Sequence, residues 1–357
     1  MNKSYMPQLD GLRAVAVAGV VIYHWFTPPF ALGQWGVTLF FVLSGYLITQ
    51  TIMSLKASGV PVSTAARIFF VRRTLRLFPA FYLVLLISAL LYDDIRRDWV
   101  WYAAYVSNIL MEIRQHFSAL KTSWSLSVEE QYYIVWFFVV MLLPAKRLPW
   151  IIALAFITEP LVRCTLIAPD HLAFRTWTLW ANCDGLVLGA LLSRLEATNK
   201  ELSLSRAALI ALAVAVGVLA ALLPPQSQWY SPIASVLVST LCAGIVWHAR
   251  RPLAGVAGAF LSNAAVVYVG RISYGVYLYP VLVPGLVNAS GLNHLPGIWR
   301  LFEPGSLAGF VVHCALTIAL ASVSFRYFEM PIRRLGSASP LSRGPQIAST
   351  AGKVGTR

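Results

Sequence analysis

The chain has 357 residues, of which 58% are hydrophobic and only 12% are charged. A soluble domain carries about 25% charged residues, so this composition excludes an ordinary soluble protein and favours a helical membrane protein. The formal net charge of +14 would suggest nucleic acid in a soluble protein. Here the basic residues lie in short segments between apolar runs, where the preference for positive cytoplasmic loops explains them, so we predict no nucleic-acid partner.

Apolar runs of about 20 residues, long enough to cross about 30 Å of hydrocarbon, recur along the chain. We predict an all-α, polytopic membrane bundle of about ten transmembrane helices, at residues 12–28, 35–54, 76–92, 128–144, 149–167, 177–194, 206–223, 231–248, 265–287 and 305–325. Residues 99–111 are apolar but too short to span comfortably, and we expect an interfacial or re-entrant helix there. The N-terminal run is expected to be retained, because Arg13 lies within it and no cleavage site follows.

Basic residues follow the even-numbered spans, whereas the loops after the odd-numbered spans are uncharged or of mixed charge. This pattern places both termini in the cytoplasm. Residues 1–335 are expected to form one membrane domain, and the Ser-, Gly- and Pro-rich residues 336–357 a disordered cytoplasmic tail. The four cysteines form no C-x-x-C pair and the six histidines lack metal spacing, so we predict no metal site.

The first predicted helix, "LDGLRAVAVAGVVIYHWF", contains Asp10, Arg13 and His24. A charge in lipid costs about 2.5–3.5 kcal/mol on insertion scales, so these residues need a compensating role. Eleven residues are three helical turns plus about 20°, which puts Arg13 and His24 on nearly the same face, about 16 Å apart. We expect Arg13 at the cytoplasmic mouth, paired with Asp10, and His24 about midway to the outer surface. Alternatively, Arg13 only snorkels and His24 bonds a neighbouring helix.

Two further motifs precede residue 80. In "FFVLSGYLIT", Ser44 and Gly45 indicate close helix packing, and Ser44 could also donate a hydrogen bond. In "RRTLRLFPAFYL", Arg73 and Arg76 are three residues apart on one helix face. They are either ordinary flanking charges or a guanidinium pair that binds the phosphates of an anionic cofactor.

The segment "TSWSLSVEEQYYIVWFF" combines aromatic rings and carboxylates, which stack on sugar rings and accept sugar hydroxyls. With the later motif "GRISYGVYLYP", it gives five candidates for contacts with a carbohydrate acceptor: Trp124, Ser127, Glu129, Tyr133 and Tyr274. Alternatively, Ser125 or Ser127 caps a helix whose first turn holds Glu129 and Glu130.

Six motifs in this order, including "FFVLSG", "WSLSVEEQYY", "ISYGVYL" and "FEMPIR", resemble the acyltransferase-3 family of integral membrane acyltransferases over about residues 5–335. The resemblance implies transfer of an acyl group, usually acetyl, from cytoplasmic acetyl-CoA to a carbohydrate. It also implies that His24 and Arg13 are the family's essential histidine and arginine, that Arg73 and Arg76 are its arginine pair, and that Glu129 is its acidic residue. Family members often have a histidine after the "SYxxYL" motif, where this chain has Tyr279 and Pro280.

Together, these observations predict an O-acyltransferase of the bacterial inner membrane that acts on a cell-surface polysaccharide, lipid-linked saccharide or lipo-oligosaccharide. Arg73, Arg76 and Arg13 would bind acetyl-CoA, and neutral His24 would accept the proton of the attacking sugar hydroxyl. Arg13, Ser44, a tyrosine or a backbone N–H could stabilise the oxyanion, with Asp10 orienting Arg13. Direct transfer and a covalent acyl intermediate both stay open, as do the acyl length and the oligomeric state. The expected partners are a carbohydrate or glycolipid acceptor and membrane lipids.

The main alternative is a polytopic transporter or flippase for a saccharide or an anionic substrate, since such proteins also bury ionisable residues within helices. No inverted repeat is visible in the sequence, and the arginines cluster at one predicted mouth. Labelled acetyl-CoA distinguishes the two, because only an enzyme transfers the label to an acceptor.

Overall fold

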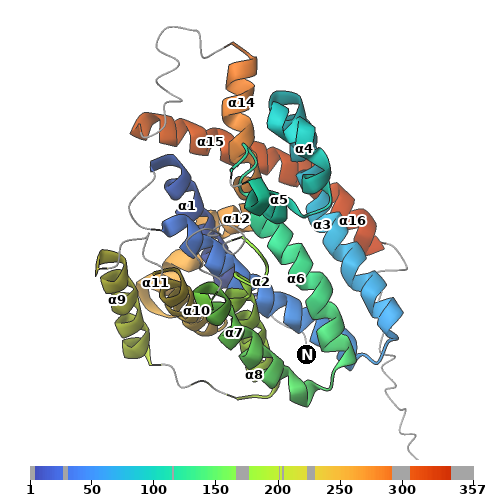
Figure 1. Cartoon of the computed structure of the whole chain (residues 1–357), viewed down its shortest axis with the longest axis vertical. Coiled ribbons are helices and arrows are strands. Elements are labelled where there is room, and N and C mark those ends of the chain that lie inside the picture. The colour runs from blue at the N-terminus through green and yellow to red at the C-terminus, as the bar shows by residue number, and fades with distance from the viewer. Residues whose placement is uncertain are drawn as a thin grey trace, which may run out of the picture.

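The computed structural model describes residues 5–26, 31–114, 116–165, 177–200, 202, 205–222, 230–291 and 306–338. These residues form helices and turns and include no strand, which confirms the predicted all-α fold. In Figure 1 the helices form one bundle, with α2 passing through its middle. The proposed tail falls mostly outside the described residues, although residues 336–338 still belong to the last helix.

The helices follow one another in the order α1 (Pro7–Phe26), α2 (Leu32–Ala57), α3 (Val62–Leu91), α4 (Asp93–Ala103), α5 (Ser107–Arg114), α6 (Ser123–Leu142), η1 (Ala145–Arg147), α7 (Leu148–Thr165), α8 (Cys183–Ala197), α9 (Arg206–Leu222), α10 (Tyr230–Ala249), α11 (Gly255–Leu261), α12 (Ala264–Arg271), α13 (Ser273–Leu278), η3 (Tyr279–Val281), α14 (Leu282–Ala289), α15 (Leu307–Ser324), η6 (Phe325–Glu329) and α16 (Met330–Ala338). A described helix therefore overlaps each of the ten predicted spans. The outermost predicted residues 27–28, 166–167, 223 and 305 lie outside the described ranges.

Five of the described helices are long and apolar enough to cross a membrane, and a sixth span results if the bent helices between Ala264 and Ala289 count as one. The five are α1, α2, α3, Pro232–Ala249 within α10 and the continuous stretch Leu307–Arg334. A multi-pass membrane protein follows from these helices, whereas the number ten stays a prediction.

Helix α3 begins 14 residues earlier than the span predicted at 76–92. Hydropathy defines that span, and the basic residues before it lower the mean hydropathy, so the predicted start of the helix comes too late. Thirty helical residues extend about 45 Å, which exceeds the hydrocarbon thickness of about 30 Å, so the first turns of α3 can project beyond the lipid. Arg73 and Arg76 consequently lie on a helix, where each has a fixed orientation.

Two other predicted elements are broken in the structure. The span predicted at 265–287 is bent by 63° between α12 and α13, and Gly270 at this break packs directly on the backbone of Asp10. Residues 99–111 fall on α4 and α5, which are separated by Tyr105 with a φ of 54°. Helices of 11 and 8 residues reach only about 16 and 12 Å, so neither spans a membrane alone.

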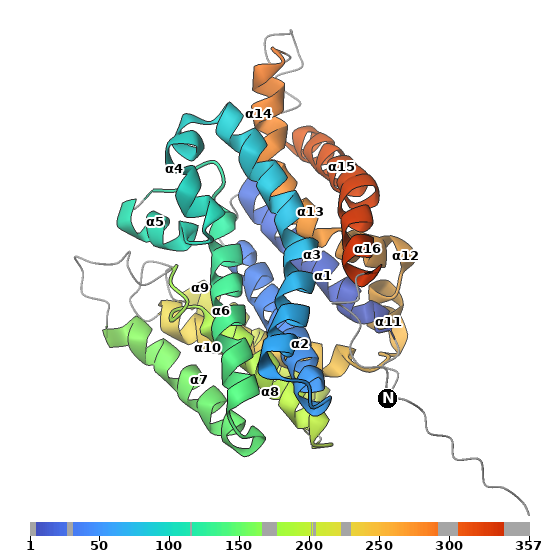
Figure 2. The same cartoon turned by 90° about the vertical axis from the view of Figure 1, so that its right-hand side faces the viewer.

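The turns of the bundle are sorted to its two ends. In Figure 2 the α2–α3 turn, the α6–α7 turn and the end of α8 lie at the lower end, which we name the basic end. These segments contain Lys56, Lys146, Arg147 and Arg194. Helices α4, α5 and α14 lie toward the upper end, which we name the α4–α5 end. This arrangement agrees with the charge rule, and a cytoplasmic position of the basic end stays a prediction.

Helix α2 contacts α1, α3, α6, α8 and α10, so it fixes the positions of most of the bundle. Its closest neighbour is α8, because Gly45 faces the carbonyl of Leu186 and Gly189 faces the carbonyl of Val42 without room for a Cβ. Small residues at such crossings let two backbones approach. The close packing indicated by the Ser44-Gly45 pair is therefore present.

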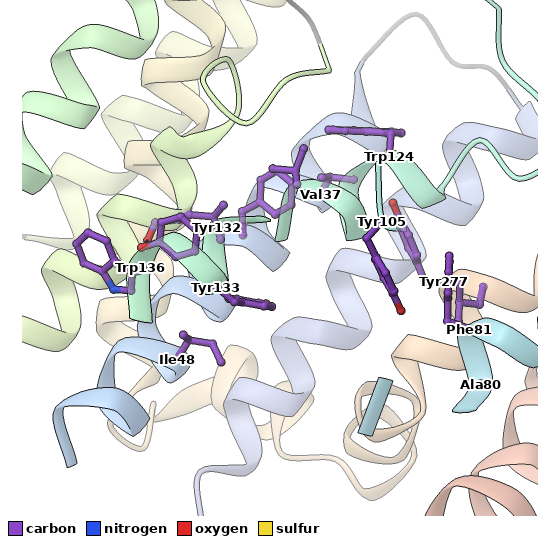
Figure 3. Packing of buried hydrophobic residues seen from close by; sticks show 14 of the residues in the cluster. Val37, Ile48, Ala80, Phe81, Tyr105, Trp124, Tyr132, Tyr133, Trp136 and Tyr277 are labelled. Atoms are coloured by element: carbon purple, nitrogen blue, oxygen red, sulfur yellow. Dashed lines mark hydrogen bonds between the residues drawn. The ribbon is translucent and has the colours of Figure 1, made fainter. Parts of the chain in front are cut away.

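Aromatic side chains of α6 fill the space beside α2. Figure 3 shows Tyr132 and Trp136 stacked on successive turns, and their ring centroids are 5.4 Å apart. The indole N–H of Trp136 donates to Thr49 Oγ1 of α2 over 2.8 Å. A buried polar group is thus paired across the α2–α6 contact, which fixes the rotation of α6 about its axis.

The contact between α2 and α8 predicts how the protein responds to an added methyl group. Gly189→Ala forces the two backbones apart, and overpacking of this kind costs about 1–3 kcal/mol. Gly217→Ala on α9 is a matched control, because nothing lies within 4 Å of the added Cβ. Thermal unfolding in detergent should show a lower midpoint only for Gly189→Ala. Equal midpoints for the two variants would contradict the observed packing.

Candidate active site

A cavity of about 360 Å³ lies between α1, α2, α3, α6 and α13. This volume is within the range of about 300–1,000 Å³ that is typical of small-molecule sites. The cavity brings together seven of the side chains proposed from the sequence: Arg13, Ser44, Arg73, Arg76, Glu129, Tyr133 and Tyr274. These residues come from five helices that are far apart in the chain, so the bundle itself assembles the site.

The wall formed by α3 is basic. Arg72, Arg73 and Arg76 all line the cavity, and helical spacing keeps Arg73 and Arg76 on one side of the helix. The guanidinium carbon of Arg73 lies 3.8 Å from the centre of the Tyr133 ring, a cation–π contact that fixes its plane. Arg72 is exposed at the surface, which shows where this wall leaves the bundle.

Arg76 is the cation with the least compensation in this cavity. Among the described residues, neither a hydrogen bond nor an ion pair joins its guanidinium to another side chain. The charges acting on it are mostly of the same sign, those of Arg13, Arg73 and Arg333, and they outnumber the opposite charge of Glu329. A partly buried guanidinium surrounded by like charge is unfavourable unless an anion is bound there. The arrangement therefore fits a ligand that carries phosphate groups.

The facing wall contains a carboxylate and hydroxyl groups. Ser44 Oγ of α2 donates to Glu129 Oε1 of α6 over 2.8 Å. The neighbouring Tyr133 hydroxyl is buried without a hydrogen-bond partner in the part of the chain that the structure describes. Tyr274 is fixed differently, because its hydroxyl donates to the Leu77 carbonyl over 2.9 Å. Hydrogen-bonding groups therefore face the arginines across the cavity.

Arg13 enters the cavity from α1 and is held by the residue expected to orient it. Its Nη1 lies 3.0 Å from Asp10 Oδ1. The Tyr5 hydroxyl donates to Asp10 Oδ2 over 2.7 Å, so both carboxylate oxygens are engaged. The pairing of Asp10 with Arg13 is present as predicted, and it restricts the directions in which Arg13 can point.

His24 lies apart from the other proposed catalytic residues. Helix α1 ends at Phe26, so His24 is near the α4–α5 end and not midway, as its sequence position had suggested. Its side chain is exposed and does not line the cavity. The Tyr23 ring is 5.6 Å from the imidazole, and Lys121 is close enough to act on its charge.

Trp124 and Ser127 are also outside the cavity wall. Trp124 is buried, with its ring edge-on to Phe41 at 6.2 Å and to Trp177 at 4.9 Å. Ser127 is buried and shares a 2.9 Å hydrogen bond with Ser107. Helix α6 begins at Ser123, so Ser125 and Ser127 lie inside it and the alternative of a helix cap is wrong.

Sequence reasoning missed several lining residues. Ser125 hydrogen-bonds to the Tyr277 hydroxyl over 2.6 Å, and both line the cavity together with Phe40. A signal for Tyr277 existed, because it follows Tyr274 by three residues and so shares its helix face. The roles of Phe40 and Ser125 depend on contacts between distant segments, for which a single sequence contains no signal.

The family described as "Acyltransferase domain" matches residues 6–326, which is most of the chain. The chain belongs to the acyltransferase-3 family. The cavity residues Arg13, Arg73, Arg76 and Glu129 all lie within the matched range. The resemblance inferred from the sequence motifs is thereby confirmed.

Curated relatives of this acyltransferase-3 chain are bacterial proteins. It is 31% identical over 372 residues to "Putative peptidoglycan O-acetyltransferase YrhL" of Bacillus subtilis, covering 94% of this chain and 56% of the relative. It is 29% identical over 365 residues to "O-acetyltransferase OatA" of Staphylococcus aureus, covering 93% and 58%. The chain thus spans less than two thirds of these relatives. No solved structure gives a significant match.

The like charges around Arg76 predict an unusual effect on stability. Arg76→Gln removes a repelled charge, so we expect the thermal midpoint of the ligand-free protein to stay the same or to rise. Arg163→Gln is the matched comparison, because Arg163 is buried on α7 and paired with the buried Glu159. Breaking a buried pair costs about 3–5 kcal/mol, so Arg163→Gln should lower the midpoint clearly. Equal losses in both variants would show that Arg76 is structurally required.

Proposed function

We propose that this protein is a membrane O-acyltransferase that moves an acyl group, in the first instance acetyl, from acyl-CoA at the basic end to a hydroxyl of a carbohydrate acceptor. The observation that carries the proposal is Arg76, a guanidinium without a partner among the described side chains, in a cavity with three further arginines. Family membership supports the reaction type, and the geometry supports the choice of an anionic acyl donor.

The arginine wall suits the phosphates of coenzyme A. Guanidinium groups bind phosphate through two parallel hydrogen bonds, and the face shared by Arg73 and Arg76 presents two such groups side by side. Arg72 extends this wall to the surface, and exposed Thr51 lies on the opposite rim. A phosphate-bearing molecule could therefore enter from the basic end without crossing lipid.

The apolar part of the same cavity suits the arm that carries the thioester. Val37, Phe40, Ile48 and Phe69 line it, and the carboxylate of Glu129 and the guanidinium of Arg13 lie among them. An amide-containing arm needs such mixed surroundings, because its backbone-like groups must keep hydrogen-bond partners within the membrane. Glu129 can accept from an amide N–H, and Arg13 can donate to a carbonyl.

We assign the role of general base to His24. The acceptor hydroxyl attacks the thioester carbonyl, and its proton passes to the imidazole as the new C–O bond forms. The C–S bond then breaks, and the leaving thiolate takes the proton from the imidazolium, so that ester and free thiol are the products. A base in this role contributes about 10²–10⁴-fold to the rate. The position of His24 near the α4–α5 end suits an acceptor that approaches from that side.

The acceptor class rests on the relatives. One curated relative is named for peptidoglycan. We therefore propose that this protein lies in a bacterial cytoplasmic membrane and that a cell-wall glycan is the acceptor to test first. The helices at that end, α4 and α5, are too short to span a membrane, so a long glycan could reach His24 from the outer side of the membrane.

Acyl transfer in isolated membranes tests the catalytic assignment. With labelled acetyl-CoA and a glycan acceptor, His24→Ala should insert normally and lose at least 10²-fold of the transfer rate. His248→Ala is the matched control, since the ring of His248 hydrogen-bonds to the Gly244 carbonyl of its own helix and does not line the cavity. Full activity of His24→Ala would contradict the assignment, and binding of acetyl-CoA without transfer by the unmodified protein would contradict an acyltransferase.

Donor recognition is tested by a second pair of variants. Arg76→Ala should raise the KM for acetyl-CoA at least tenfold, because a charge-assisted contact to phosphate contributes about 1.5–3 kcal/mol. Arg67→Ala removes an exposed arginine of the same helix that does not line the cavity, and its KM should stay unchanged. Equal KM values in both variants would remove the arginine wall as the donor site.

A further inference from the structure

The end of the cavity nearest to His24 is covered by side chains from three helices. The Phe40 ring of α2 packs edge-on against Tyr277 of α13, with centroids 6.1 Å apart. The Tyr277 hydroxyl then bonds to Ser125 of α6. In Figure 3 Tyr277 projects toward the start of α6, where Trp124 lies. Trp124 in turn contacts Phe41, so this series of contacts begins and ends on α2.

Packing registers place this cover between Arg13 and His24. Gly33 of α2 faces Tyr23 of α1, and Gly36 faces the carbonyl of Ala16, so the two helices run antiparallel. Four residues further along α2, the Cα of Phe40 is therefore about level with that of Arg13. Helical side chains lean toward the N-terminus of their own helix, so the Phe40 ring leans toward the α4–α5 end and the Arg13 side chain toward the basic end. On the other side, Gly270 faces Asp10, and α13 then continues along α1. The cover consequently lies beyond Arg13 and before His24.

This cover separates the cavity from His24, although the proposed reaction requires the thioester to reach the imidazole. Arg13 lines the cavity on one side of the cover, and His24 is outside it. Tyr277, Ser125 and Phe41 are all buried, with 6%, 4% and 3% of their surfaces exposed. A thioester held in the apolar part of the cavity could not meet the imidazole while these side chains keep their positions.

We propose that Phe40 and Tyr277 form a gate that closes the acyl-donor cavity toward His24, and that the hydrogen bond between Tyr277 and Ser125 holds this gate shut. The inference rests on the proposed function, since it gives the reacting carbonyl a path to His24. Tyr277 is in this view a positioning residue. It acts on the thioester through the gate and takes no part in the bond changes.

The local structure allows such a gate to open. Helix α13 has only six residues and lies between a 63° bend and the 3-10 turn η3, so it can move separately from α12, although it packs against α15 and α1. Hinges usually use a few residues at element ends of this kind. A single neutral hydrogen bond contributes about 0.5–1.5 kcal/mol, so losing this bond costs little, and most of the cost of opening comes from the packing of the Tyr277 ring. The closed gate would also keep water from the α4–α5 end away from the thioester.

Cysteine accessibility tests the gate without any need for acyl transfer. Leu47→Cys places a thiol on α2 within the cavity, on the basic side of Phe40. A membrane-impermeant thiol reagent should label it rapidly from the basic end and slowly from the α4–α5 end. Adding Tyr277→Ala should raise the rate from the α4–α5 end at least tenfold, and Tyr277→Phe, which loses only the hydrogen bond, should raise it less. The parent chain with its native cysteines gives the background.

Tyr279→Phe is the matched control, because it removes a tyrosine hydroxyl from the same segment whose hydrogen bond goes to Ser324. Its labelling should equal that of Leu47→Cys alone. Rapid labelling of Leu47→Cys from the α4–α5 end without a gate substitution, or unchanged labelling after Tyr277→Ala, would overturn the gate. Labelling from the basic end in every variant shows that the cavity has formed.

Acetyl-CoA hydrolysis without acceptor gives a second readout. The rate of hydrolysis without acceptor is divided by the rate of acyl transfer measured with acceptor. If the gate excludes water, Tyr277→Phe should raise this ratio several-fold, whereas Tyr279→Phe should not. An unchanged ratio would overturn the water-excluding role. Absence of any transfer by the unmodified protein would reject the proposed function, while the accessibility result would still decide whether the gate exists.

Discussion

Like charge enclosed by an apolar bundle is the constraint on which the site depends. Four arginines line one cavity, and a single carboxylate, Glu129, lines it with them. The protein moderates their repulsion locally, through the ion pair of Arg13 with Asp10 and the stacking of Arg73 on Tyr133. The remaining excess of positive charge is a property of the folded protein, and a polyanionic ligand would remove it. Affinity for phosphate can thus come from relieving repulsion as much as from new contacts.

The glycine contacts explain how such a cavity keeps its shape. Helices α2 and α8 approach so closely at Gly45 and Gly189 that neither can slide without a clash. Helix α2 therefore acts as a fixed support for Ser44 and Phe40, while the segment on the other side of the cavity is held where Gly270 packs on Asp10 and then bends by 63° into the six-residue helix α13. Rigid support on one side and a discontinuous helix on the other are a suitable basis for a site that must admit a flexible substrate.

Much of this architecture could be predicted from sequence because hydropathy and charge act locally. Apolar runs located the helices, and the basic turns are gathered at one end as the charge pattern indicated. The start of α3 was misplaced because its first turns are polar enough to resemble a loop, although they continue the helix. For the site, residue type and spacing identified Arg13, Arg73, Arg76 and Glu129, which do meet in space.

The rest depended on tertiary contacts. Trp124 looked like a sugar platform from its neighbours in sequence, but its ring is buried against Phe41 and Trp177. The separation of His24 from the cavity could not be predicted either, since it follows from where α1 ends and from the side chains that α2, α6 and α13 place in front of it. Periodicity reports which face a residue occupies, and it contains no information about what covers that face.

The length of α3 has one more consequence. Helix α3 is about 15 Å longer than the hydrocarbon layer is thick. If the excess lies at the basic end, the first turns of α3 project into water and extend the arginine wall beyond the membrane. The nucleotide part of the proposed donor could then bind to these turns while still hydrated. Only the narrow arm that carries the thioester would pass between the helices. The opening between the helices would need to be only as wide as this arm, which would limit the leakage of ions across the membrane during turnover.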